Sequence, residues 1–269
     1  MKPVAATFQY LKHRFKAKRW DSFHSPYLFH LFTTCCDDKS DSTDYNGIEK
    51  ERNRFKASDE IIQRRDYGAG SVSIAGQQQK IAAIAGHALS SPFQCRFLAR
   101  LVKFTQATTI LEFGSSLGIS GAYLAIGNPA ASVTTVEGDP ALASRSKKVF
   151  ETLGLRNIQI ITDTFESYIS KEPKDISSID ILFLDGNHQS KALLEYYHAL
   201  KHLYQPETVI VVDDIYWSAD MQTGWNELMA LEEVTQSVDC YHFGLLFFNK
   251  GFLQKENHVV KLPLRSVFR

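Results

Sequence analysis

Apolar residues follow two different patterns along this chain of 269 residues. From residue 109 onward, short runs of aliphatic and β-branched residues alternate with longer segments of mixed character. The short runs predict buried strands and the longer segments predict helices, so this part is expected to form a doubly wound α/β sheet with mostly parallel strands. We expect strands at 109–111, 132–137, 158–163, 179–184 and 208–212, with helices at 118–127, 140–154, 189–204 and 219–233.

The last part of the chain departs from this alternation. Residues 241–249 and 257–262 are both strand-like, and a short loop containing Gly251 separates them. Two strands joined by a short glycine-containing loop predict an antiparallel hairpin at the end of the sheet. With the five runs above, the sheet is expected to have seven strands.

The first 87 residues differ again and are expected to form a mainly helical extension that acts as a substrate or lid region, before a domain that covers residues 88–269. Within residues 1–20, Phe8, Leu11 and Phe15 have helical spacing, and six basic residues occur without an acid. One interpretation is a surface helix for an anionic lipid or an anionic substrate. We favour the other, a helix that packs on its own domain with a solvated basic face.

Residues 37–66 are polar, and residues 77–87 predict a helix. Between them, 66–71 form a glycine-rich turn with no preceding strand. It predicts either a loop that touches a ligand or a plain turn.

Composition excludes several classes of protein. The formal net charge is zero, which argues against a general nucleic-acid binder. No run of 18 apolar residues predicts a membrane span, and the basic N-terminus lacks the apolar core of a secretory signal. Four cysteines without zinc-site spacing, the first two adjacent, suit a reduced cytoplasm. Nothing here fixes the oligomeric state, so a homodimer stays open. The cysteines are Cys35, Cys36, Cys95 and Cys240.

A glycine-rich turn after the first predicted strand is the most informative local feature. Glu112 ends the strand, and Gly114, Gly118 and Gly121 follow it. Glycines between a strand and a helix let a ligand approach the backbone at the helix N-terminus. This spacing differs from the Gly-x-Gly-x-x-Gly of dinucleotide sites, and an acid there suits a ligand with an ammonium group. The turn therefore favours S-adenosylmethionine over NAD, with a purely structural turn as the alternative.

Each of the five apolar runs ends in a carboxylate. Glu137 follows the second strand, 19 residues after Gly118, where it can accept hydrogen bonds from ribose hydroxyls. Asp163 and Thr164 follow the third strand, where an adenine amino group would lie. Asp185 follows the fourth. Each acid alone could be a helix cap, the interpretation we favour for Asp163 taken by itself. Together, the five acids predict a ligand crevice at the carboxyl edge of the sheet.

These motifs resemble those of class I S-adenosylmethionine-dependent methyltransferases, and in particular the catechol, caffeoyl-coenzyme A and macrocin types of O-methyltransferase. The resemblance covers about residues 88–250, and it implies a Rossmann-like seven-stranded sheet ending in an antiparallel hairpin. It rests on Leu-Glu-Phe-Gly-Ser-Ser-Leu-Gly (111–118), Val-Glu-Gly-Asp-Pro (136–140), Phe-Leu-Asp-Gly-Asn-His (183–188) and Val-Val-Asp-Asp-Ile-Tyr-Trp (211–217).

The resemblance also implies a chemistry. In the resembling enzymes, three side chains after the fourth and fifth strands hold Mg²⁺, and the matching residues here are Asp185, Asp213 and Asp214. His188 matches a catalytic base, and Trp217, with its neighbour Tyr216, could wall the acceptor. The alternatives are that Asp213 caps a helix, that Asp214 is merely solvated, and that His188 and Trp217 are structural.

The sequence thus predicts O-methylation of a small hydroxylated metabolite, with His188 and Asp185 as catalytic residues. Metal-independent N- or carboxyl-methylation and a non-catalytic cofactor-binding protein are the alternatives; an NAD-dependent oxidoreductase is disfavoured by the glycine spacing and the terminal hairpin. The residues expected to bind S-adenosylmethionine are Glu112, Gly114, Ser115, Gly118, Ser120, Glu137, Gly138, Asp163, Thr164 and Asp185.

Overall fold

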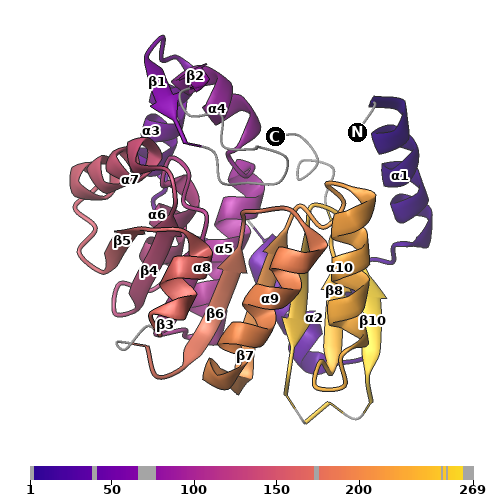
Figure 1. Cartoon of the computed structure of the whole chain (residues 1–269). Helices are drawn as coiled ribbons and strands as arrows, with labels where there is room; N and C mark the ends of the chain where they lie inside the picture. The colour runs from indigo at the N-terminus through magenta and orange to yellow at the C-terminus, as the bar shows by residue number, and fades with distance from the viewer. Residues whose placement is uncertain are drawn as a thin grey trace.

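A computed structural model describes residues 3–37, 41–65, 77–172, 176–249, 251–252 and 254–262. The predicted turn at 66–71 lies outside them. One eight-stranded sheet forms the centre, in the order β10-β8-β9-β7-β6-β3-β4-β5, with helices on both faces (Figure 1). Its strands are β3 (Thr109–Phe113), β4 (Ser132–Glu137), β5 (Ile158–Thr162), β6 (Ile179–Leu184), β7 (Tyr204–Asp213), β8 (Gln236–Asp239), β9 (Phe243–Phe247) and β10 (Glu256–Val259).

Strands β3 to β7 pair in parallel, which confirms the doubly wound α/β sheet. Neighbouring residues of a strand point to opposite faces and enter two different cores. Ile110 packs with α2 (Pro26–Cys36) and α5 (Pro92–Thr105), whereas Leu111 packs with the helices of the other face. The remaining helices of the domain are α6 (Ile119–Gly127), α7 (Pro140–Thr152), α8 (Phe165–Ser170), α9 (Ser190–Leu200), followed by a 3₁₀ turn Lys201–Leu203, and α10 (Ala219–Ala230).

The end of the sheet differs from the prediction in strand count and pairing. The antiparallel hairpin is formed by β8 and β9, and β10 pairs in parallel with β8. The hairpin expected between 241–249 and 257–262 is therefore wrong, and the sheet has eight strands instead of seven. Strand β8 reads Gln-Ser-Val-Asp, so its sequence lacks the apolar run by which the other strands were found.

The N-terminal extension is mainly helical, as predicted. It contains α1 (Pro3–Lys16), a 3₁₀ turn at Trp20–Ser22, α2, α3 (Asn46–Lys56) and α4 (Ile81–His87). It also contains a two-stranded sheet of β1 (Ile61–Arg64) and β2 (Gln77–Lys80), so the helix expected at 77–87 begins only at Ile81. The extension packs on the domain through a third core, in which Ile48, Phe55 and Ile84 meet residues of α5, α6 and α7.

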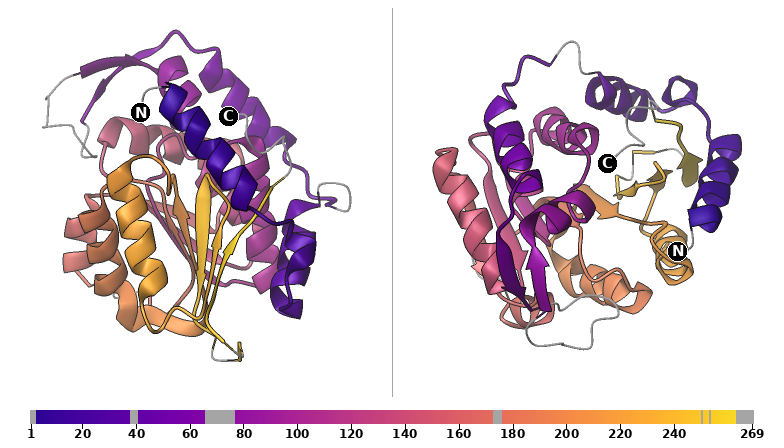
Figure 2. Two further views of the ribbon diagram at one scale, coloured as in Figure 1. Left: turned by 90° about the vertical axis from the view of Figure 1, so that its right-hand side faces the viewer. Right: turned by 90° about the horizontal axis from the view of Figure 1, so that it is seen from above.

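The two ends of the described chain meet beside the sheet. Lys18 pairs with Val260, and the Lys18 amide donates a hydrogen bond to the Val259 carbonyl at 2.9 Å. Figure 2 shows α1 on the outside of the molecule, near β8 and β10. No helix among the described residues has the length and apolar character needed to cross a membrane.

Candidate active site

The turn after β3 is formed by a backbone that only glycine fits. Gly114 has a φ of 99°, and a Cβ there would lie 1.9 Å from the carbonyl oxygen of Asp185. Gly118 begins α6 with a φ of 80°, and a Cβ there would lie 2.8 Å from Ser146 Cα. The backbone after β3 therefore lies against the backbone after β6, which leaves no room for a side chain at Gly114.

Glu137 ends β4 beside this turn and faces a cavity. Its Oε2 accepts a hydrogen bond from the Ser116 amide at 2.8 Å, and its Oε1 accepts one from the Asp139 amide at 2.9 Å. Burial raises the pKa of Glu137 to about 7, although these two hydrogen bonds lower it. The carboxylate is thus fixed in position, and each oxygen retains a lone pair for a ligand hydroxyl.

The cavity follows the carboxyl edge of the sheet, as expected for a parallel α/β fold. It has a volume of about 330 Å³. Five residues predicted to bind the cofactor line it, together with His188, Asp214 and Trp217 from the predicted acceptor side. The five are Gly114, Glu137, Gly138, Thr164 and Asp185.

The other five predicted cofactor residues do not line the cavity. Ser115 bonds Ser146, 3.3 Å away between hydroxyl oxygens, and Ser120 is buried in α6. Gly118 supports the turn through its backbone. Glu112 is fully buried below the turn, where its Oε2 would lie 2.8 Å from a Cβ at Gly121. Burial raises the pKa of Glu112 to about 7, so the expected contact with a ligand ammonium group has no support in this geometry.

Asp163 is the fifth, and it supports the start of α8. It accepts hydrogen bonds from the Thr164 amide at 3.0 Å, the Ser167 hydroxyl at 3.1 Å and Lys171 Nζ at 2.5 Å. The hydrogen bond from Lys171 lowers the pKa of Asp163. The N-cap of α8 is Thr164, whose hydroxyl accepts a hydrogen bond from the Ser167 amide at 3.2 Å, so the cap expected at Asp163 lies one residue later. Thr164 and Phe165 line the cavity.

At the other end of the cavity, His188 lies against Trp217. Their ring centroids are 5.3 Å apart and the rings are tilted by 36°. Trp217 is 54% exposed, so it forms a cavity wall and does not belong to the core. Asp185 and Asp214 line the same cavity, which places two carboxylates and one imidazole around the space where an acceptor would enter.

Asp213 is separated from this group. It is 2% exposed; its Oδ1 accepts a hydrogen bond from Gln94 Nε2 at 2.5 Å, and its Oδ2 accepts one from the Ser90 hydroxyl at 3.4 Å. The backbone turns at Asp214, with a φ of 52°, so the two adjacent acids point apart. Among the described residues, no group of three His, Cys, Asp or Glu side chains could hold a metal ion. The three-carboxylate set expected for Mg²⁺ is therefore not assembled.

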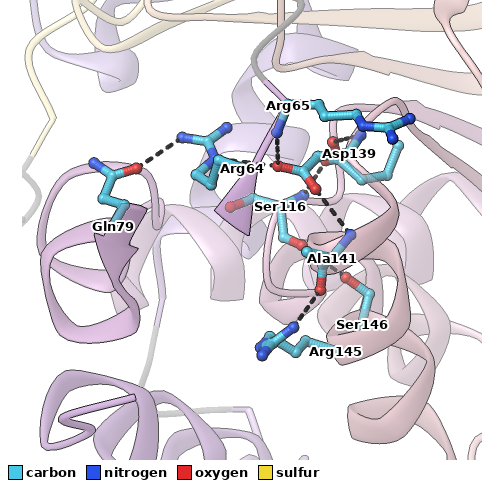
Figure 3. A network of polar contacts seen from close by, with 9 residues as sticks. Arg64, Arg65, Gln79, Ser116, Asp139, Ala141, Arg145 and Ser146 are labelled. Carbon is cyan, nitrogen blue, oxygen red and sulfur yellow. Dashed lines mark hydrogen bonds and ion pairs between the residues drawn. The ribbon is translucent and has the colours of Figure 1, made fainter. Parts of the chain in front are cut away.

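The N-terminal extension lines part of the cavity, with residues that the sequence analysis did not single out. They are Arg64 and Gln79 of the β1–β2 sheet, Arg65 directly after β1, and His87 at the end of α4. Asp139, 1% exposed, holds this sheet: its Oδ2 accepts hydrogen bonds from the Arg65 amide at 3.0 Å and Arg64 Nε at 3.3 Å (Figure 3).

The same carboxylate caps α7, because its Oδ1 accepts a hydrogen bond from the Ala141 amide at 2.8 Å. Asp139 thus fastens the extension to the helix that follows Glu137. The sequence contains the Gly-Asp-Pro motif after Glu137, but it did not predict strand β1, whose Arg64 is bonded to Asp139 of this motif.

Sequence and structure comparisons agree with this geometry. Residues 111–215 match a protein family described as "Methyltransferase domain". This segment of the chain is similar to methyltransferase domains. The matched segment begins in β3 and ends just after Asp214, so it contains the glycine turn, Glu137, Asp185 and His188.

Two curated relatives match parts of the chain. A catechol O-methyltransferase of Niastella koreensis is 30% identical over 128 residues, 46% of this chain. A protein-L-isoaspartate O-methyltransferase of Gloeobacter violaceus is 31% identical over 93 residues, 34% of this chain. The chain spans 57% and 44% of the length of these relatives.

Solved structures share the fold at low sequence identity. SAH-bound methyltransferase PaMTH1 of Podospora anserina has a TM-score of 0.59 at 14% identity, over 85% of this chain and 97% of its own. An O-methyltransferase of Bacillus cereus in complex with SAH has a TM-score of 0.54 at 24% identity, over 62% of this chain and 86% of its own. These likenesses confirm the fold.

Proposed function

We propose that this chain is an S-adenosylmethionine-dependent O-methyltransferase that acts on a small hydroxylated molecule. The observation that carries the proposal is Glu137, whose carboxylate is held by two backbone amides at the wall of the cavity, next to the close approach at Gly114. A carboxylate in this position suits the two hydroxyls of a ribose. The curated relatives that match the chain are both named O-methyltransferases, which supports the same activity here.

The residues present fit S-adenosylmethionine in other respects. Thr164 and Phe165 give a wall for the adenine beyond Glu137, and Gly114 lines the same cavity with backbone atoms alone. When bound, S-adenosylmethionine supplies a methyl group activated by a sulfonium. The protein must therefore orient the acceptor oxygen and remove its proton.

His188 is the residue we assign to proton removal. It lines the cavity together with Asp185 and Trp217, and an imidazole is the side chain most often used as a general base. The indole of Trp217 gives a flat apolar wall on which an acceptor can be oriented. Asp185, which lines the same cavity, would favour the imidazolium that forms after proton transfer.

The residues predicted to hold Mg²⁺ lie only partly at the cavity. Since Asp213 is bonded to Gln94 and Ser90, only Asp185 and Asp214 of the three predicted ligands line the cavity. Two carboxylates can still bind a hard cation that keeps water ligands, so a role for Mg²⁺ stays a prediction and is tested separately below.

The proposal is tested by ligand binding and by turnover. Calorimetric titration should show binding of S-adenosylhomocysteine, and no heat with NAD or NADP at the same concentration. Incubation with methyl-labelled S-adenosylmethionine and a panel of catechols, sugars and hydroxy acids should yield a labelled ether. Binding without labelling of any hydroxyl, nitrogen or carboxyl acceptor would favour the non-catalytic alternative, and labelling of nitrogen alone, or of carboxyl groups alone as a methyl ester, would contradict methylation of a hydroxyl.

A further inference from the structure

Helix α1 is attached to the domain by one face of mixed polar and aromatic character. His13 Nε2 lies 3.0 Å from Asp239 Oδ1, and both residues are buried. The Tyr10 ring meets the Tyr241 ring edge-on, with centroids 5.0 Å apart. Arg14 Nη1 donates a hydrogen bond to the Leu262 carbonyl at 3.2 Å. These contacts come from one side of the helix and fix its orientation.

The opposite face of α1 carries the large apolar residues. Phe8, Leu11 and Phe15 are 72%, 48% and 89% exposed. The helix does pack on its own domain, as the favoured interpretation of the sequence held, but its apolar stripe points outward and not inward. Three large apolar side chains together in solvent mark an interaction surface, because isolated exposed residues are common but aligned ones are not.

The charges around this stripe are all basic. Lys12 and Lys16 are exposed and, at 100° per residue, share the outward face with the stripe. Lys18 and Arg19 follow directly and are also exposed. No acidic residue occurs before Asp21, which pairs with Arg19 at 3.2 Å. The outward face therefore joins apolar side chains with ammonium groups on long stems, which can reach past the apolar layer.

We propose that the outward face of α1, formed by Phe8, Leu11, Lys12, Phe15 and Lys16, binds the surface of a bilayer that contains anionic lipids. Helices of this type lie in the plane of the interface, with apolar side chains among the acyl chains and lysines at the head groups. The position of α1 suits this occupant. It lies on the outside of the molecule, where a flat bilayer can reach it (Figure 2).

A vesicle sedimentation assay tests this proposal with the full chain. Vesicles of phosphatidylcholine with about 30% phosphatidylserine should carry the protein into the pellet at low salt. Vesicles of pure phosphatidylcholine should carry down at most about one tenth of that amount of protein. Phe8→Ser with Phe15→Ser should abolish pelleting. Lys12→Glu with Lys16→Glu should also abolish it, and added salt should weaken the wild type, because the attraction is electrostatic.

Matched variants elsewhere on the surface control for total charge and apolarity. Lys147→Glu with Lys148→Glu reverses two exposed lysines on α7, and Ile61→Ser removes a side chain that is 56% exposed on β1. Both should pellet like the wild type. Unchanged melting temperature and S-adenosylhomocysteine binding in the α1 variants would show that the fold is intact, which separates this proposal from the function proposed above.

Two results would overturn the proposal. One is equal pelleting of the wild type and both α1 variants. The other is sedimentation velocity showing a dimer that Phe15→Ser converts to a monomer, with no vesicle binding, because the stripe would then be covered by a second copy of the chain.

Discussion

Gln94 donates a hydrogen bond to Asp213, with 2.5 Å between Nε2 and Oδ1, and so connects the start of α5 to the end of β7. Both residues are buried, and Ser90 contacts the other oxygen of the same carboxylate. The first acid of the Asp-Asp pair thus joins Ser90 and the start of α5 to the sheet. The second acid, one residue later, faces the cavity. Adjacent residues with the same side chain therefore have different roles.

Exchanging each acid for asparagine should separate these roles. Asp213→Asn should lower the free energy of unfolding by about 1–2 kcal/mol, because buried charge-assisted hydrogen bonds become neutral ones. Asp214→Asn should change it by less than about 0.5 kcal/mol, since asparagine tolerates the positive φ at this position. Urea unfolding of both variants measures the difference.

Magnesium dependence should follow Asp214 and not Asp213. If a divalent cation assists turnover, chelator should lower the rate, and Mg²⁺ should restore it in Asp213→Asn but poorly in Asp214→Asn. Full turnover in excess chelator would remove the metal role. Loss of the Mg²⁺ response in a stable Asp213→Asn protein would instead support the three-carboxylate set that the sequence predicted.

Glu137 and Asp163 offer a second matched pair, because both acids were predicted to bind the cofactor. Glu137→Gln should weaken binding of S-adenosylhomocysteine by about 1.5–3 kcal/mol, since it removes an ionised acceptor and turns an amide group toward a backbone donor. Asp163→Asn should leave the affinity within about threefold, because Asp163 bonds α8 and does not line the cavity. Equal losses in calorimetric titrations of the two variants would contradict the ribose assignment.

These two pairs show which features of the site could be predicted from the sequence. Each apolar run identified a strand, and the acid after it identified the correct edge of the sheet, because strand ends follow directly from local pattern. The position of the Asp213 carboxylate depends on a contact distant in sequence. Gln94 lies 119 residues earlier in the chain, and its pairing with Asp213 has no local signature.

The same limit explains the missed elements. Strand β8 is recognisable only by its partners, because its sequence is largely polar. Arg64 joins the cavity through Asp139, 75 residues later in the chain.

Glu112 should make stability depend on pH. Its pKa is raised to about 7 in the fold, against an unfolded value of 4.5. The folded state then binds the extra proton between these values, so the contribution of Glu112 to stability is present below about pH 4.5 and is lost as pH rises toward 7. The side chain of the Glu112→Gln variant is neutral at every pH, so the free energy of unfolding of this variant should fall less as the pH rises.

Unfolding free energies of the wild type and Glu112→Gln should be compared at pH 5 and pH 8. The variant should be more stable than the wild type at pH 8, by on the order of 3 kcal/mol if the whole shift is realised, and should differ little at pH 5. Glu137 titrates in the same range, so some slope should remain in the variant. An equal difference at both pH values would indicate a packing effect and would contradict a titrating Glu112.

The last prediction concerns His188, the cavity residue to which we assign proton removal. His188→Ala should keep affinity for S-adenosylhomocysteine, because the residue lies at the acceptor end, yet slow the chemical step by roughly 10²–10⁴-fold, the usual contribution of a positioned base. A base must be unprotonated, so the wild-type rate should rise as the pH is raised and then level off. The rate of His188→Ala should not show this rise. His198→Ala, which removes an exposed histidine on α9, is the control and should behave as wild type. Single-turnover rates across pH 5–9 measure both effects, and a retained rise in His188→Ala would assign the proton to another group of the cavity.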